Sequence, residues 1–166
     1  MLQNRNEILL VTTGGTIDGH LSPLAGKSGR RSRIPPLVRG RLRVRANVAV
    51  KELMAKDSRA MSEGDLEAIA KCCRECRQGR VVVTHGTYGM ERAARHLAGK
   101  KIGKTIVLTG AHVPLGKTGD AEFNLGSALM AARLLPRGVW VVTQGEVFAA
   151  LNVTKNLKSG FFQKRR

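Results

Sequence analysis

Glycine-flanked threonines follow three separate apolar runs of the chain. These turns read Thr12-Thr13-Gly14-Gly15-Thr16, Thr84-His85-Gly86-Thr87 and Thr109-Gly110-Ala111. A threonine hydroxyl becomes a nucleophile when a base and oriented donors surround it. Backbone N–H groups exposed by glycines can hold an anion or a developing oxyanion. Taken one at a time, each turn also fits a purely structural role, and no phosphate-binding G-x-x-x-x-G-K-[ST] motif occurs.

The apolar runs before these turns predict buried parallel strands. Strands are expected over residues 7–12, 48–54, 80–84, 104–109 and 139–143. Helical spacing predicts helices between them, from the N-cap Ser62 to about residue 79, over 91–98 and over 122–135. This alternation predicts an α/β fold with three layers, a mostly parallel sheet with helices on both faces. Ligands bind beyond the carboxyl ends of such strands, where the threonine turns would meet.

Length and composition restrict the class of protein. The chain has 166 residues, of which 42% are hydrophobic, so a single domain over residues 1–166 is expected. No apolar run approaches the roughly 18 residues of a membrane span, and the first residues do not resemble a signal peptide. Cys72, Cys73 and Cys76 do not suggest a disulfide framework. We therefore expect a cytoplasmic protein with no membrane association and no metal site, since neither the cysteines nor the histidines have ligand spacing.

The segment from about residue 18 to 45 differs from the rest of the chain in composition. It is rich in glycine and proline, and eight basic residues without an acid lie between Lys27 and Arg45. We expect a basic, mobile loop here, with a short helix after Pro36 or an edge strand over residues 41–45 as alternatives. The formal net charge of the chain is +17, which attracts polyanions, so nonspecific contact with nucleic acid is a second hypothesis.

Six motifs, taken in order, resemble those of bacterial-type L-asparaginases. They are T-T-G-G-T-I (12–17), D-S-R-A-M (57–61), V-V-V-T-H-G-T (81–87), K-T-I-V-L-T-G-A (104–111), G-D-A-E-F-N (119–124) and V-T-K-N (153–156). The resemblance covers residues 7–156 and corresponds to the N-terminal domain of the longer members. It implies an amidohydrolase that converts asparagine, a small-molecule amide, to aspartate and ammonia without a cofactor. Because the longer members build their sites across subunits, it also implies a homodimer.

The resemblance assigns roles residue by residue. It makes Thr16 the nucleophile, Thr87 the second threonine and Lys104 the lysine that activates it. The substrate-binding residues that it implies are Gly15, Ser58, Gly86, Tyr88 and Ala111.

Several positions depart from the family pattern. Tyr88 stands where the family has the aspartate that receives the substrate's α-ammonium, Ala60 replaces a second acid, and residues 18–45 contain no tyrosine. These departures support an alternative reading, an asparaginase-like domain with impaired catalysis that binds anions or RNA through its basic loop.

Overall fold

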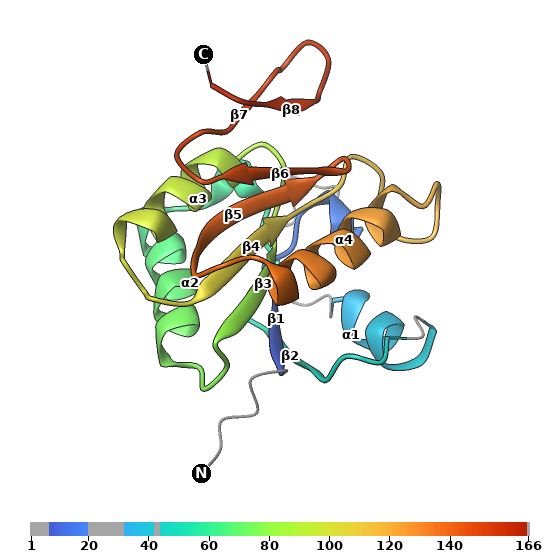
Figure 1. Cartoon of the computed structure of the whole chain (residues 1–166). Coiled ribbons are helices and arrows are strands. Elements are labelled where there is room, and N and C mark those ends of the chain that lie inside the picture. The colour runs from blue at the N-terminus through green and yellow to red at the C-terminus, as the bar shows by residue number, and fades with distance from the viewer. Residues whose placement is uncertain (1–6, 20–31, 42–43, 166) are drawn as a thin grey trace.

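The computed structural model describes residues 7–19, 32–41 and 44–165, and its centre is a six-stranded sheet (Figure 1). The strands are β1 (Ile8–Thr12), β2 (Val48–Glu52), β3 (Arg80–Thr84), β4 (Thr105–Thr109), β5 (Gly138–Thr143) and β6 (Glu146–Ala149). Their order across the sheet is β2-β1-β3-β4-β5-β6. The first five run parallel, and β6 pairs antiparallel with β5. The predicted α/β class with a mostly parallel sheet is confirmed.

Helices cover both faces of the sheet, as the pattern predicted (Figure 1). The helices α2 (Glu63–Glu75) and α3 (Met90–Gly99) lie on one side, and α1 (Ile34–Pro36) and α4 (Asp120–Leu134) lie on the other. Successive strand residues therefore point into different cores: Leu9 and Val11 pack with α2 and α3, whereas Ile8 and Leu10 pack with α1 and α4. Strands buried on both faces read as continuous apolar runs, which is why periodicity identified them.

The start of α2 confirms the predicted N-cap. The Ser62 hydroxyl accepts a hydrogen bond from the Asp65 N–H at 3.2 Å, and the Asp65 carboxylate accepts from the Ser62 N–H at 2.8 Å. This reciprocal pair satisfies two N–H groups that the first helical turn leaves without partners. The helix ends at Glu75, four residues before the expected Gly79, because Cys76 adopts an extended backbone.

Part of the expected loop over residues 18–45 is helical. The helix α1 continues directly into η2 (Leu37–Arg41), and Ile34 and Val38 are buried in the core beneath α4. The alternative of an edge strand over 41–45 is contradicted at its described residues, since Arg41 ends η2 and residues 44–45 form no strand. The edge strand β2 begins at Val48. The expectation of mobility falls mainly on residues 20–31 and 42–43, which lie outside the described residues.

The strand order places a topological switch between β1 and β3. The chain leaves β1 toward β2 on one side and reaches β3 on the other, and such a switch opens a crevice at the carboxyl ends of the two strands. Register aligns the last residues of three neighbouring strands, Thr12 beside Thr84 and Thr84 beside Thr109. The three threonine turns therefore leave the sheet at one edge, as expected from the sequence.

Candidate active site

The turns after β1 and β3 touch each other through two glycines. Gly15 has a φ of +85°, and a Cβ atom built on it would lie 2.7 Å from both the Cα and the backbone nitrogen of Gly86. A Cβ on Gly86 would in turn lie 2.4 Å from the Ser58 hydroxyl oxygen. Side chains at these two positions would force apart the segments that carry Thr16, Thr87 and Ser58. Glycine is therefore required here for close approach and, at Gly15, for the left-handed backbone.

A pocket of about 200 Å³ opens where these segments meet. Its lining residues are Gly15, Thr16, Asp57, Ser58, Arg59, Gly86, Thr87, Tyr88, His112 and Lys155. Six of the eight predicted site residues are thus brought together from three separate segments of sequence. Ala111, expected to contribute a backbone group, does not line this pocket; its side chain is buried in the core on the α1 and α4 side, and the next residue, His112, lines the pocket.

Lys155 is the lysine of this pocket. Its ammonium nitrogen donates to the Thr87 hydroxyl oxygen at 2.9 Å, and partial burial lowers the pKa of Lys155. An amine that loses its proton more readily is better suited to accept one from a threonine hydroxyl. Sequence reasoning missed this residue although it lies in the V-T-K-N motif, which carried the signal.

A C-terminal hairpin holds Lys155 in place. It consists of β7 (Thr154–Lys155) and β8 (Phe162–Gln163), which pair antiparallel. The Val153 and Phe162 side chains are buried in the core on the α2 and α3 side. The Phe162 N–H also donates to the Gln144 side-chain oxygen at 2.9 Å, in the turn between β5 and β6. These contacts fix the hairpin against the body of the domain.

Lys104 is not placed to activate Thr87, and that prediction was wrong. The residue immediately precedes β4, whereas Thr87 follows the carboxyl end of the neighbouring parallel strand β3. Five strand residues separate the two ends of β4, which is roughly 16 Å at a rise of about 3.3 Å per residue. The Lys104 ammonium instead donates to the backbone oxygens of Arg74 and Cys76, at the end of α2.

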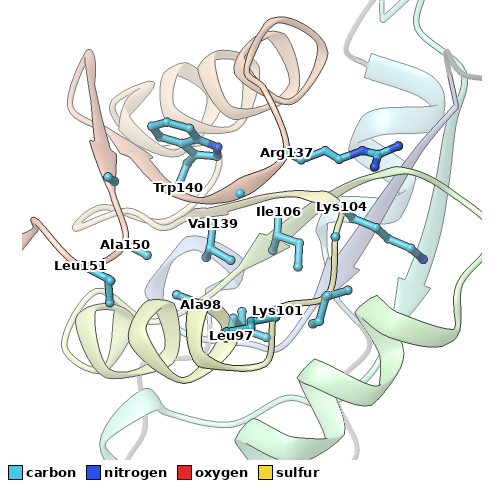
Figure 2. A pocket seen from close by; sticks show the side chains of 14 residues that line it. Leu97, Ala98, Lys101, Lys104, Ile106, Arg137, Val139, Trp140, Ala150 and Leu151 are labelled. Atoms are coloured by element: carbon cyan, nitrogen blue, oxygen red, sulfur yellow. The ribbon is translucent and has the colours of Figure 1, made fainter.

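Lys104 borders a second, mostly apolar pocket of about 490 Å³ at the opposite edge of the sheet. Figure 2 shows Leu97, Val139 and Ala150 facing this hollow, with the Lys104 side chain directed away from it. The two pockets are chemically different, since the described lining of this one includes none of the site threonines. We place the candidate chemistry at the smaller pocket.

Asp57 and Ser58 come from the short 3₁₀ helix η3 (Ser58–Ala60) and its N-cap. The Asp57 carboxylate caps the helix by accepting from the Arg59 N–H at 2.8 Å, and it also binds the Arg59 guanidinium at 2.7 and 3.1 Å. Hydrogen bonding to Arg59 holds the pKa of Asp57 below its usual range. The Ser58 hydroxyl accepts from the Gly89 N–H at 3.0 Å, which ties η3 to the start of α3.

Tyr88 lies at the mouth of the pocket with 59% of its surface exposed. The Arg59 guanidinium carbon is 5.7 Å from the centre of its ring, and the Lys155 nitrogen is 5.1 Å from it. Both distances allow a cation–π interaction. The ring is therefore flanked by two cations, at the position where the family pattern has a carboxylate.

His85 lies in the turn that follows β3. It is fully buried, and its Nδ1 lies 2.8 Å from the Gly86 carbonyl oxygen. Burial lowers the pKa of His85, and the contact with Gly86 opposes this only in part. A neutral imidazole that donates from Nδ1 fits this geometry, consistent with a role in shaping the turn.

The described residues contain no group of three or more histidine, cysteine or acidic side chains arranged to hold a metal ion. Among the same residues, no helix combines the length and apolar character that crossing a membrane requires.

Comparison with protein-family models identifies the family. The model for the N-terminal domain of asparaginase matches residues 7–162. The chain therefore belongs to the asparaginase family and contains its N-terminal domain. Comparison with curated protein sequences gave no significant match.

Three solved structures show the same fold. The L-asparaginase I from Vibrio cholerae has a TM-score of 0.80 at 22% identity, over 96% of this chain and 51% of that one. The thermostable L-asparaginase from Thermococcus kodakarensis has a TM-score of 0.76 at 24% identity, over 95% and 51%. The probable cytoplasmic L-asparaginase from Campylobacter jejuni has a TM-score of 0.74 at 26% identity, over 95% and 52%. The chain thus spans about half the length of these structures.

Proposed function

We propose that this domain is an amidohydrolase of the asparaginase type, which splits a primary carboxamide into a carboxylate and ammonia. The observation that carries the proposal is the hydrogen bond from Lys155 to the Thr87 hydroxyl, in a pocket that Thr16 also lines. A hydroxyl held against an amine of lowered pKa can accept a proton from a neighbouring weak oxygen nucleophile, here the Thr16 hydroxyl or a water. Membership in the asparaginase family and the position at the switch point agree with this function.

The proposed chemistry has two steps. The Thr16 oxygen attacks the amide carbon, the carbon–nitrogen bond breaks, and ammonia leaves with the hydroxyl proton. Water then attacks the resulting ester, one of its protons passes to the Thr87–Lys155 pair, and the Thr16 oxygen regains a proton as the carboxylate is released. Thr16 is the nucleophile, Thr87 and Lys155 transfer protons, and Ser58 orients the substrate.

Ammonia release from asparagine, measured with purified chain, tests the proposal. The Thr16→Val variant sets the background, and wild-type release no higher than this background would refute the function. Lys155→Met should lower kcat by about 10²- to 10⁴-fold, the usual contribution of a positioned acid or base. Lys104→Met is the matched control, because it removes a lysine of the same domain from the opposite edge of the sheet, and it should retain activity.

The oligomeric state and location stay predictions. A homodimer is expected from the resemblance, and light scattering on the purified chain would test it. A cytoplasmic location agrees with the description of the Campylobacter jejuni structure as a probable cytoplasmic L-asparaginase.

A further inference from the structure

Asp57 contributes the carboxylate of the pocket, and Arg59 already neutralises it. Among the described lining residues no other carboxylate is present. One Asp57 oxygen accepts from the Arg59 backbone N–H and Nε, and the other accepts from Nη2 at 2.7 Å. A substrate ammonium that approached Asp57 would have to displace this paired guanidinium or share the carboxylate with it. The pocket therefore offers no uncompensated negative charge to an α-ammonium.

Two cationic side chains lie beside the Tyr88 ring of the pocket. Arg59 and Lys155 flank the Tyr88 ring at 5.7 and 5.1 Å, so the negative ring face is already directed toward two cations. A further cation placed here would meet the Lys155 ammonium and an arginine already paired with Asp57, rather than a free counter-ion.

The same groups suit an anion. A guanidinium carries five N–H donors and stays protonated at all ordinary pH values, and the Arg59 side chain uses two of its nitrogens on Asp57. The Arg59 side chain is 53% exposed, so its remaining donors can reach a ligand. Charge-assisted hydrogen bonds from arginine to carboxylates are among the stronger contacts in proteins.

We infer that the substrate is a primary amide that carries a carboxylate and lacks an α-ammonium, a monoamide of a dicarboxylic acid such as succinamate. This inference rests on the proposed amidohydrolase function and specifies its substrate class. The reaction forms a carbon–oxygen bond from water and breaks the carbon–nitrogen bond, so that succinamate and water give succinate and ammonia. No oxidant or further reactant is required.

Succinamate and asparagine provide a direct comparison, because they differ only in the ammonium group. We expect kcat/KM for succinamate to exceed that for asparagine by at least about tenfold, which corresponds to about 1.4 kcal/mol. Tyr88→Asp introduces a carboxylate beside Arg59 and Lys155, and it should shift this ratio toward asparagine by at least about tenfold. Tyr88→Phe is the matched control, since it keeps the ring and adds no charge, and it should leave the ratio unchanged.

Product binding gives a second readout that needs no turnover. Calorimetry on the wild type and on Thr16→Val should show tighter binding of succinate than of aspartate, and Tyr88→Asp should reverse this order. Circular dichroism confirms that each variant is folded.

The outcomes separate the two proposals. Faster hydrolysis of asparagine than of succinamate would overturn the substrate class but leave the amidohydrolase function standing. The same conclusion would follow if Tyr88→Asp changed the ratio of the two kcat/KM values no more than Tyr88→Phe does. Release of ammonia from neither compound above the Thr16→Val background overturns the function itself. In that case, tighter binding of aspartate than of succinate would overturn the substrate class as well.

Discussion

Replacing Gly15 by alanine tests whether the contact between the two turns builds the site. Gly15 has a φ of +85° and a ψ of −178°, a region of backbone space that is essentially restricted to glycine. The new methyl group would lie 2.7 Å from the Cα and nitrogen of Gly86 and 3.2 Å from the carbonyl carbon of His85. These are backbone atoms of a buried turn, so no side-chain rotation relieves the overlap.

Two contributions set the size of the effect. Holding a non-glycine residue in this backbone region costs about 1–3 kcal/mol, and forcing an extra methyl group into a packed interior costs about another 1–3 kcal/mol. Together they lower the free energy of unfolding by about 2–6 kcal/mol, out of roughly 5–15 kcal/mol for a typical domain. If the turns separate to relieve the strain, Thr16 moves away from Thr87. A displacement of about 1 Å can lower activity by about 10²-fold.

Urea denaturation followed by circular dichroism measures the first effect, and ammonia release measures the second. Gly126→Ala is the matched control, because this glycine lies within the helix α4 and a Cβ atom added to it would meet nothing within 4 Å. It should stabilise the chain by about 0.4–1 kcal/mol and leave activity unchanged. A Gly15→Ala variant within about 0.5 kcal/mol of wild type, with full activity, would refute the claim that the glycine contact assembles the site.

Three further predictions concern the interior. Because burial lowers the pKa of His85, the unfolded chain takes up this proton first as the pH falls below about 6.5. The free energy of unfolding should therefore decrease toward low pH by at most about 1.4 kcal/mol per pH unit, and urea titrations of His85→Asn should show a weaker dependence. Burial raises the pKa of Cys73 to about 12, so iodoacetamide at pH 8 should label the partly exposed Cys76 first, and mass spectrometry that found Cys73 labelled first would contradict this. Asn124 is buried, donates to the Gly110 carbonyl at 2.9 Å and accepts from the Gln144 N–H at 2.8 Å. Asn124→Leu should lower the unfolding free energy in urea by about 1–3 kcal/mol for each partner left unsatisfied, and an unchanged midpoint would contradict the prediction.

The sheet could be predicted because its strands are buried on both faces. Residues 8–11 and 81–83 are continuously apolar, and each run is followed by a threonine and a glycine-containing turn, a pattern typical of buried parallel strands. Once the strands are parallel, the threonine turns must emerge at one edge. Sequence patterns therefore placed Thr16 and Thr87 in one pocket without any knowledge of distances.

The lysine could not be predicted in the same way. Lys104 and Lys155 both lie in motifs that match the family, and polarity alone does not distinguish them. What distinguishes them is the direction of the chain, since Lys104 comes before its strand and the site lies after the strands. Lys155 reaches Thr87 through a hairpin held by the burial of Phe162 and by Gln144. The V-T-K-N motif marks Lys155 as part of the family pattern, but the long-range docking that brings it to Thr87 cannot be read from the motif alone.

The charge of the pocket depends on pairing rather than on composition. In the sequence, Asp57 is an acid next to Ser58, a predicted substrate-binding residue. The turn of η3 brings Arg59 onto the same carboxylate, so the acid is neutralised within two residues of itself. The cation that remains under-compensated is Lys155, over the Tyr88 ring. A substitution such as Tyr88→Asp therefore places a carboxylate beside Lys155 and removes the excess positive charge that a substrate meets, although it changes the net charge of the chain, +17, by only one unit.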